Sequence, residues 1–210
     1  MARQLSLLSA TVQAPAVEDL EGLLCGPGHV VRRGDAARLS VVVPGGWRVA
    51  PLLAGLVALE LAGDAVAVGG QRPPYGGAPY GGVPAAGTGM VSVRTAFDPR
   101  LVPVAARWFA GARLVAPAGL HLDGGRLRWW VLAAGRPDRL GYRLAVGPNA
   151  EPVWPAVGAA LAAAGLPATF LGPRADGPAY RLVGGRRLAR LRELVGEPPE
   201  GVPPGAWPAS

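Results

Sequence analysis

The sequence predicts an α+β fold made of two copies of one element order, helix–strand–strand–helix–strand–strand–helix (αββαββα). Apolar residues recur first at helical and then at alternating spacing, in the same succession in both halves of the chain. Both middle helices end in Ala-Gly followed by strand-like residues, at 62–63 and at 164–165. Half of the 210 residues are hydrophobic, which is enough to build a substantial core.

The first copy is expected to occupy residues 1–107. Its expected helices are 16–25, 47–61 and one that begins at Asp98-Pro99, and its expected strands are 29–43, 64–69 and 90–97. The helix at 47–61 is favoured by an apolar face, which consists of Val49, Leu52, Leu53, Leu56 and Leu59. Asp98-Pro99 indicates a helix start because Asp is a favoured N-cap and Pro fits the first helical position.

The second copy is expected over residues 108–196. It is predicted to begin with a helix containing Trp108-Phe109-Ala110-Gly111. Its remaining expected elements are strands at 120–122, 126–132, 142–146, 168–171 and 179–183, a helix around 153–161 that Gly165 ends, and a helix around 188–194 that Gly196 ends.

Two segments depart from this globular pattern. Residues 70–89 are rich in Pro, Gly and Tyr and contain the near-duplicate PPYGG and APYGG, which predicts a mobile loop. Residues 197–210 contain five prolines and predict a disordered tail.

The charge distribution favours a polyanionic partner. The net charge is +7, and every one of the 21 basic residues is Arg, whose planar guanidinium suits bidentate contact with phosphate. Residues 1–105 hold eight Arg and seven acids, whereas residues 106–210 hold thirteen Arg and seven acids. The second half therefore carries most of the positive charge.

The sequence gives no sign of a disulfide framework or a membrane span. Cys25 is the single cysteine and ends an apolar run, so we expect a buried thiol. The longest apolar stretch, 49–59, is too short to cross a bilayer, and the N-terminal apolar run is too short for a signal peptide. We therefore expect a cytoplasmic protein.

Residues 20–28 read Leu-Glu-Gly-Leu-Leu-Cys-Gly-Pro-Gly. This segment resembles the LAGLIDADG nonapeptide of homing endonucleases in its aliphatic residues and glycines. Together with the segment Glu18–Leu24 it is similar to the N-terminal part of WhiA-type actinobacterial sporulation regulators. The resemblance implies two repeats that form a β-saddle backed by helices on duplex DNA. No helix-turn-helix pattern follows residue 196, so promoter recognition of the WhiA kind is not implied.

The resemblance departs from active nucleases at the metal-binding acids. The two acidic positions of the motif hold Cys25 and Pro27, and in the second copy they fall near Leu114 and Ala116. Two-metal cleavage needs carboxylates at the helix ends. We therefore expect an inactive endonuclease-like fold without a catalytic residue, a metal or another cofactor.

Other residues have two interpretations. Gly22 and Gly111 are expected at the repeat interface, where small residues let two helices approach, although each could instead be a weak helix position. Glu21, Asp35 and Asp123 are expected at the surface. His29 and His121 are expected after the two motif helices, where repeat symmetry explains them better than a metal or a general base.

Strand alternation predicts an Arg-rich open face on the sheets. The residues expected there, and therefore expected to bind DNA, are Arg38, Ser40, Arg94, Arg126, Arg128, Trp130, Arg143 and Arg181. A solvated face in an Arg-biased sequence is the competing interpretation.

The sequence thus favours a non-catalytic duplex DNA-binding protein, regulatory or architectural, that acts as a monomer or homodimer. A module for structured RNA is the first alternative, since the same basic saddle suits an A-form helix. A protein-interaction scaffold without a nucleic-acid role is the second. An enzyme that uses other carboxylates is the third.

Overall fold

The computed structural model describes residues 14–68, 89–148, 150–173 and 177–208. The first repeat consists of η1 (Val17–Leu20), α1 (Glu21–Cys25), β1 (Gly28–Arg33), β2 (Ala36–Pro44), α2 (Val49–Ala58), β3 (Gly63–Ala67), β4 (Met90–Thr95), η2 (Pro99–Leu101) and α3 (Val102–Trp108). A short hairpin follows, formed by β5 (Phe109–Ala110) and β6 (Arg113–Leu114). The second repeat consists of α4 (Gly124–Ala134), β7 (Gly135–Asp138), β8 (Gly141–Ala145), α5 (Trp154–Ala163), β9 (Thr169–Leu171), β10 (Ala179–Leu182) and α6 (Gly185–Val195).

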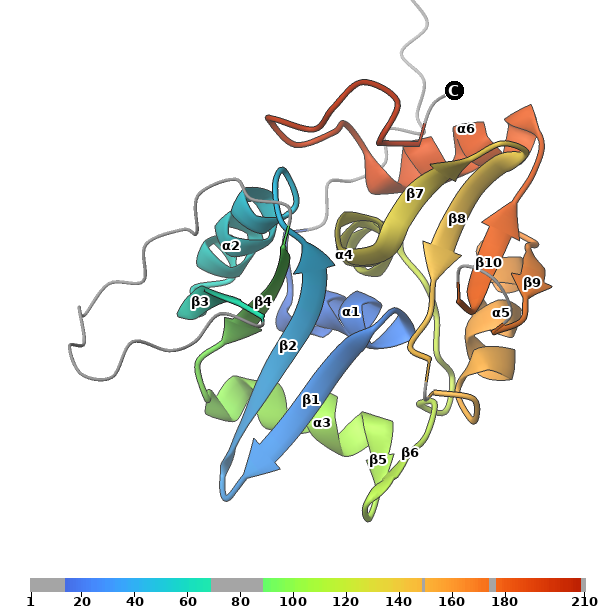
Figure 1. The fold of residues 1–210 in the computed structure, drawn as a ribbon. Coiled ribbons are helices and arrows are strands. Elements are labelled where there is room, and N and C mark those ends of the chain that lie inside the picture. Colours follow the sequence, from blue (N-terminus) through green and yellow to red (C-terminus); the bar gives the residue numbers. More distant parts are fainter. Residues whose placement is uncertain (1–13, 69–88, 149, 174–176, 209–210) are drawn as a thin grey trace, which may run out of the picture.

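The two repeats form two antiparallel sheets of identical topology. The strand order is β1-β2-β4-β3 in the first sheet and β7-β8-β10-β9 in the second. Helices α1 and α4 lie side by side between the two sheets (Figure 1). The predicted α+β class and the doubled αββαββα order are therefore confirmed.

One face of each sheet packs into a common hydrophobic core. In β2 the buried side chains alternate, with Leu39, Val41 and Val43 each at most 1% exposed. In the second sheet Leu144 and Leu182 are fully buried in the same way. The residues between these positions lie on the opposite, open face of each sheet, as strand alternation requires.

Helices α1 and α4, which are the motif helices of the two repeats, are in contact at glycine residues of α1 and of the turn that follows it. A Cβ on Gly22 of α1 would lie 1.9 Å from the carbonyl oxygen of Arg126 in α4, which no side chain can occupy. A Cβ on Gly26 would lie 2.8 Å from the Trp130 indole. Gly22 therefore lies at the contact between the two repeats, where only the absence of a side chain allows this approach.

The prediction of a strand at 126–132 is wrong, because these residues belong to helix α4. The Asp123 side chain caps the helix by accepting a hydrogen bond from the Arg126 backbone N–H at 2.9 Å. Almost every side of α4 is buried, from Arg126 to Ala133. Because α4 is buried on nearly all sides, its sequence lacks the one-sided apolar pattern of an amphipathic helix. Its apolar residues instead alternate as they would in a strand.

The second repeat begins with α4 and not at residue 108. Trp108 ends α3, and Gly111 lies in the turn of the β5–β6 hairpin, where its φ is +64° and a Cβ would meet nothing within 4 Å. Gly111 is therefore a turn glycine and not an interface residue. Leu114 ends β6 and Ala116 follows it, so neither lies at the end of a motif helix.

The C-terminal segment also differs from its prediction. Trp207 is 5% exposed, and its indole N–H donates to the carbonyl of Gly196 at 2.9 Å. The Tyr142 hydroxyl donates to the carbonyl of Ala206 at 3.0 Å. A buried tryptophan and these hydrogen bonds thus fasten residues 197–208 to the second repeat, despite their prolines.

The predicted mobile loop at 70–89 falls, except for Gly89, outside the described residues. Among the helices that the structure describes, none is both long and apolar enough to cross a membrane.

We predict that Gly22→Ala lowers the free energy of unfolding by about 1–3 kcal/mol or more, the usual cost of overpacking a core. The added methyl group has to push α1 away from the Arg126 backbone. Gly185→Ala is the matched control, since a Cβ there meets nothing within 4 Å. Denaturant unfolding followed by circular dichroism measures both variants, and equal stability of the two would contradict the packing role.

Candidate nucleic-acid interface

Three arginines cross the open face of the second sheet in one row. Arg143 of β8 is the register partner of Arg136 in β7 and of Arg181 in β10. Arg181 in turn is paired with Thr169 of β9. Because the alternate residues Tyr142 and Leu144 are buried, these arginines lie on the face turned away from the core.

Asp138, at the end of β7, holds two of these arginines in place. Its Oδ2 forms an ion pair with the Nε of Arg143 at 3.0 Å and a second one with the Nε of Arg181. Desolvation acts to raise the pKa of Asp138, but Arg143, the Arg139 backbone N–H and Arg181 lower it below its ordinary value. The aspartate therefore stays ionised and orients both guanidinium groups at neutral pH.

The open face of the first sheet has a different character. Ser40 is the register partner of His29 and Arg94, and Arg94 is bound bidentately by Asp64 of β3, at 2.6 and 3.0 Å. The side chains of Arg94 and Asp64 are 37% and 44% exposed. Arg38 stacks on the Phe97 ring at 4.3 Å. The charge of Arg94 is thus balanced by a carboxylate.

Valines cover the neighbouring part of this face. Val42 and Val66 are both register partners of Ser92, and they are 38% and 43% exposed. Met90, one row further along, is 44% exposed. The first sheet therefore presents exposed apolar groups in the row beside Ser40 and Arg94.

Five of the eight residues predicted for DNA binding lie on these faces, namely Arg38, Ser40, Arg94, Arg143 and Arg181. The other three do not, because their segment is helix α4. Arg128 donates to the carbonyls of Val195 and Glu197, at 2.6 and 2.8 Å. Trp130 is fully buried and donates to the carbonyl of Ala145 at 2.7 Å.

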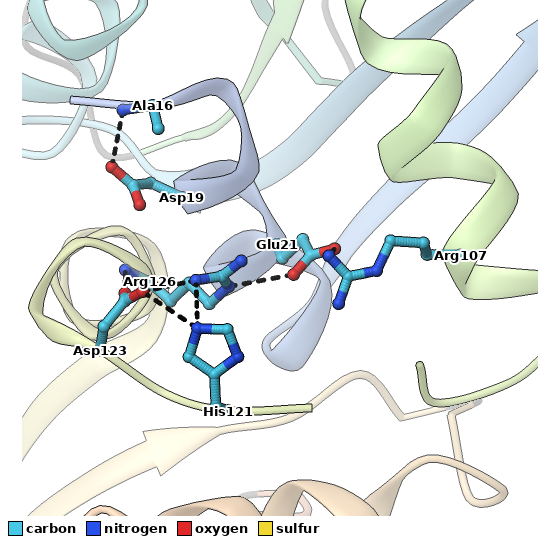
Figure 2. Close-up of polar contacts among 7 residues, drawn as sticks. All are labelled: Ala16, Asp19, Glu21, Arg107, His121, Asp123 and Arg126. Atoms are coloured by element: carbon cyan, nitrogen blue, oxygen red, sulfur yellow. Dashed lines mark hydrogen bonds and ion pairs between the residues drawn. The ribbon is translucent and has the colours of Figure 1, made fainter. Parts of the chain in front are cut away.

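Arg126, the third of the predicted DNA-binding residues that lie in α4, belongs to a buried ionic cluster at the contact of α1 and α4 (Figure 2). The Glu21 carboxylate is fully buried and pairs with the Arg126 Nε at 3.0 Å and with the Arg107 Nη1 at 3.1 Å. Arg126 also contacts Asp123 at 2.5 Å and the His121 ring at 3.2 Å. One carboxylate of α1 thereby joins α3 and α4.

This cluster corrects the prediction that Glu21 and Asp123 are surface acids. Burial acts to lower the pKa of Arg126, but Glu21 and Asp123 raise it above its ordinary value, so the guanidinium is charged. Asp19, which lies beside Gly125 of α4, has a raised pKa chiefly because it is partly buried. His29 lies on β1 and His121 beside Arg126, so the two histidines hold dissimilar places.

The ends of the two motif helices carry no carboxylate. Gly28 and Gly135 begin the strands that follow α1 and α4, so Leu132 and Ala134 hold the positions that Cys25 and Pro27 hold in the first repeat. Cys25 is 2% exposed, and burial first, then the negative charge of Glu21, raises the pKa of its thiol.

A partly buried guanidinium caps the end of α4. Arg48, which precedes α2, donates to the carbonyls of Val131 at 3.2 Å, of Leu132 at 2.5 Å and of Gly135. Burial lowers the pKa of Arg48. A positive charge satisfies the carbonyl end of a helix and opposes the binding of a metal cation there. Within the described residues, no group of three or more His, Cys, Asp or Glu side chains could hold a metal ion.

No protein-family model and no curated protein sequence matches this chain. Among solved structures, it is similar to the homing endonuclease I-WcaI bound to its DNA recognition sequence. The TM-score is 0.58 at 10% sequence identity, over 85% of this chain and 79% of that chain. The chain therefore has a fold like that of the LAGLIDADG homing endonucleases, and an identity this low shows the fold alone.

Sequence reasoning missed several residues of the site. Asp138 and Asp64 lie in short edge strands, β7 and β3, and Arg136 precedes a proline in the same strand as Asp138. The sequence did contain a signal for this hairpin, namely the segment Gly135-Arg136-Pro137-Asp138 followed by a two-residue turn. Glu21 had a weaker signal, since an acid surrounded by leucines needs a buried partner.

We predict that Glu21→Gln lowers the free energy of unfolding by about 1–3 kcal/mol, because Arg126 loses its buried charged partner and keeps only the partly exposed Asp123. The double variant Glu21→Leu/Arg126→Met should recover most of that loss. Arg190→Ala is the control, since its pair with Glu193 is exposed and worth under about 1 kcal/mol. Additive effects of Glu21→Leu and Arg126→Met, compared with their double variant in a double-mutant cycle, would contradict the buried pair.

We predict that Cys25 does not react with a thiol-specific disulfide reagent in the folded protein at about pH 8, because its thiol is buried and its pKa is raised. One thiol per chain should react when the protein is unfolded in concentrated guanidinium chloride. The chain has one cysteine, so the whole signal reports this position. Rapid labelling of the native protein would mean that the end of α1 is open to solvent.

Proposed function

We propose that this protein binds duplex DNA through the open faces of its two sheets and does not cut it. The observation that carries the proposal is the row of Arg136, Arg143 and Arg181 across three adjacent strands. Guanidinium groups contact phosphates and base edges, and a sheet surface can follow the groove of a duplex. The LAGLIDADG-like fold supports this proposal, since the similar I-WcaI structure holds its DNA recognition sequence.

The absence of cleavage is proposed from the ends of the motif helices. Cleavage by two metals requires oxygen ligands close to the scissile phosphate. The equivalent positions hold Cys25, Pro27, Leu132 and Ala134, and Arg48 places a positive charge on the last carbonyls of α4. A cation at this end would meet a guanidinium and apolar side chains.

A regulatory or architectural role follows if the protein binds without cutting. Similarity to the WhiA-type regulators stays a prediction that rests on the segment Glu18–Leu24. The buried ionic cluster and Arg48 serve to hold the helices, so we assign DNA contact to the sheets alone.

We predict that the parent protein binds a labelled random duplex in fluorescence anisotropy, and that its affinity falls steeply between low and moderate salt. The variant Arg143→Ala/Arg181→Ala should bind more weakly, and the slope of log K against log salt should become shallower by about 0.9 for each phosphate that is no longer contacted. Arg187→Ala/Arg190→Ala is the matched control, because it removes two exposed arginines of α6 and leaves the sheets unchanged.

Equal binding by the parent protein and both variants would contradict the sheet as the interface. Melting curves of each variant distinguish weaker binding from unfolding. A structured RNA hairpin in the same assay tests the alternative partner, and preference for the hairpin over the duplex would overturn the proposal.

We predict no nicking of the bound duplexes in Mg²⁺ or Mn²⁺, as seen on denaturing gels. The variant Arg48→Ala should be equally inactive, because removing the guanidinium supplies no carboxylate. Metal-dependent nicking by the parent protein that EDTA abolishes would contradict the absence of catalysis.

A further inference from the structure

Strand β3 forms the edge of the first sheet that lies away from the second repeat (Figure 1). At both ends of its pairing with β4 the backbone bonds are defined: the Val68 N–H donates to the Met90 carbonyl at 2.8 Å, and the Ala62 carbonyl accepts from the Ala96 N–H at 2.7 Å. Bonded positions alternate along an antiparallel pair, so every second residue of β3 directs its N–H and C=O groups outward. These residues are Gly63, Ala65 and Ala67.

The other three edge strands of the two sheets carry features that oppose pairing with another chain. Strand β1 ends in the exposed Arg32 and Arg33, β7 contains Pro137, and β9 has only three residues. Charges, prolines and short length are the usual protection of a sheet edge. Strand β3 has five residues without Arg, Lys or Pro, and its single acid, Asp64, is bound by Arg94 of the same sheet. None of its residues is buried, so this edge is open to a partner strand.

We propose that β3 pairs antiparallel with β3 of a second copy of this chain, about a twofold axis at Val66. The pairing joins the two four-stranded first sheets edge to edge. The proposal concerns the outer edge of the first sheet and does not depend on the binding of DNA.

A second copy fits this edge because the strand is complementary to itself. With the axis at Val66, Ala65 lies opposite Ala67 of the second copy, and each such pair exchanges two backbone hydrogen bonds. The two Val66 side chains face each other in a non-hydrogen-bonded pair, where Cα atoms lie about 4.5 Å apart. Asp64 lies opposite Val68, so no like charges meet across the axis. The twofold symmetry uses the same edge in both copies and therefore closes at a dimer.

Exposed apolar side chains next to this edge favour the pairing. Val66, Val68 and Met90 are 43%, 52% and 44% exposed. Side chains on one face of neighbouring antiparallel strands contact each other, and pairs of β-branched residues stabilise the sheet. Dimerisation therefore removes apolar surface of both copies from water. One pair of short strands is a small interface, so we expect a reversible dimer that forms as the protein concentration rises.

Sedimentation equilibrium of the parent protein over a wide range of concentration tests the proposal. The expected result is a monomer at low concentration and a dimer at high concentration. Val66→Lys places two positive charges opposite each other and should weaken the dimer roughly 10-fold or more. Val57→Lys is the matched control, because Val57 is 72% exposed on α2, away from the edge, and its replacement should leave the dimer unchanged.

A second variant tests the backbone pairing itself. Ala67→Pro removes an outward N–H and leaves the hydrogen bonds between β3 and β4 in place, as proline on an edge strand does. It should also shift the protein to the monomer, and its melting curve shows whether the fold is kept. Hydrogen exchange followed by NMR should show the amides of Ala65 and Ala67 protected at high protein concentration and unprotected at low concentration.

Cross-linking tests the position of the axis. Val66→Cys should form a disulfide between two chains under mild oxidation, because the expected Cα separation lies within the range of about 4.4–6.8 Å that a disulfide spans. Val57→Cys is the control and should remain largely uncoupled. Cys25 is 2% exposed and should not contribute to the cross-link.

Three results would overturn the inference. The first is a parent protein that stays monomeric at every concentration. The second is a dimer that persists in both Val66→Lys and Ala67→Pro, which would place the interface elsewhere. The third is equal cross-linking of Val66→Cys and Val57→Cys. Binding of DNA by the parent protein is measured separately, so its presence or absence does not alter these outcomes.

Discussion

The contact between α1 and α4 determines how the two repeats are arranged. At Gly22 the two helices approach so closely that a methyl group would overlap the Arg126 carbonyl. Each helix leads directly into the first strand of its own sheet, at Gly28 and Gly135. Those glycines are held against the preceding helix, where a Cβ would lie 2.4 Å from the Leu23 carbonyl oxygen and 2.7 Å from that of Val131. The helix contact therefore fixes how the two sheets lie relative to each other.

The buried charges at this contact explain how the pairing is specified. Glu21 and Arg126 lose their hydration, and a buried pair of this kind contributes little net stability compared with apolar side chains. The pair instead disfavours other registers of the two helices, because sliding α1 along α4 would leave a carboxylate and a guanidinium without partners in the core. This cost favours one register of the two helices, while Arg107 ties α3 to the same carboxylate.

The opposite ends of the same helices show different chemistry. There the chain has a buried thiol at Cys25, the Trp130 indole against Gly26, and the Arg48 guanidinium on the carbonyls of α4. These groups pack and satisfy the helix ends. Recognition of a partner by the open faces of the sheets does not require a reactive centre between the helices.

The first repeat could be predicted well from the sequence and the second only in part. The helix at 49–58 has a clear apolar face, and Asp98 caps the next helix by accepting from the Arg100 N–H at 2.8 Å. Helix α4 could not be recognised by periodicity, since it is buried on nearly all sides and the apolar residues Leu127, Trp129 and Val131 happen to alternate. That single misassignment moved Arg126, Arg128 and Trp130 from the core to the open face. Arg143 and Arg181 were placed correctly, because β8 and β10 bury alternate residues, whereas their partner Asp138 depends on the register of the sheet.

A crystal structure of the protein with a duplex selected by it, grown in Mg²⁺, would show whether the sheets bind DNA without cutting it. We expect an intact duplex that lies across the open faces of both sheets, with Arg143 and Arg181 in contact with it and no cation between the ends of α1 and α4. A duplex bound to another face, or a metal ion at a cleaved phosphate beside Cys25 and Leu132, would contradict it.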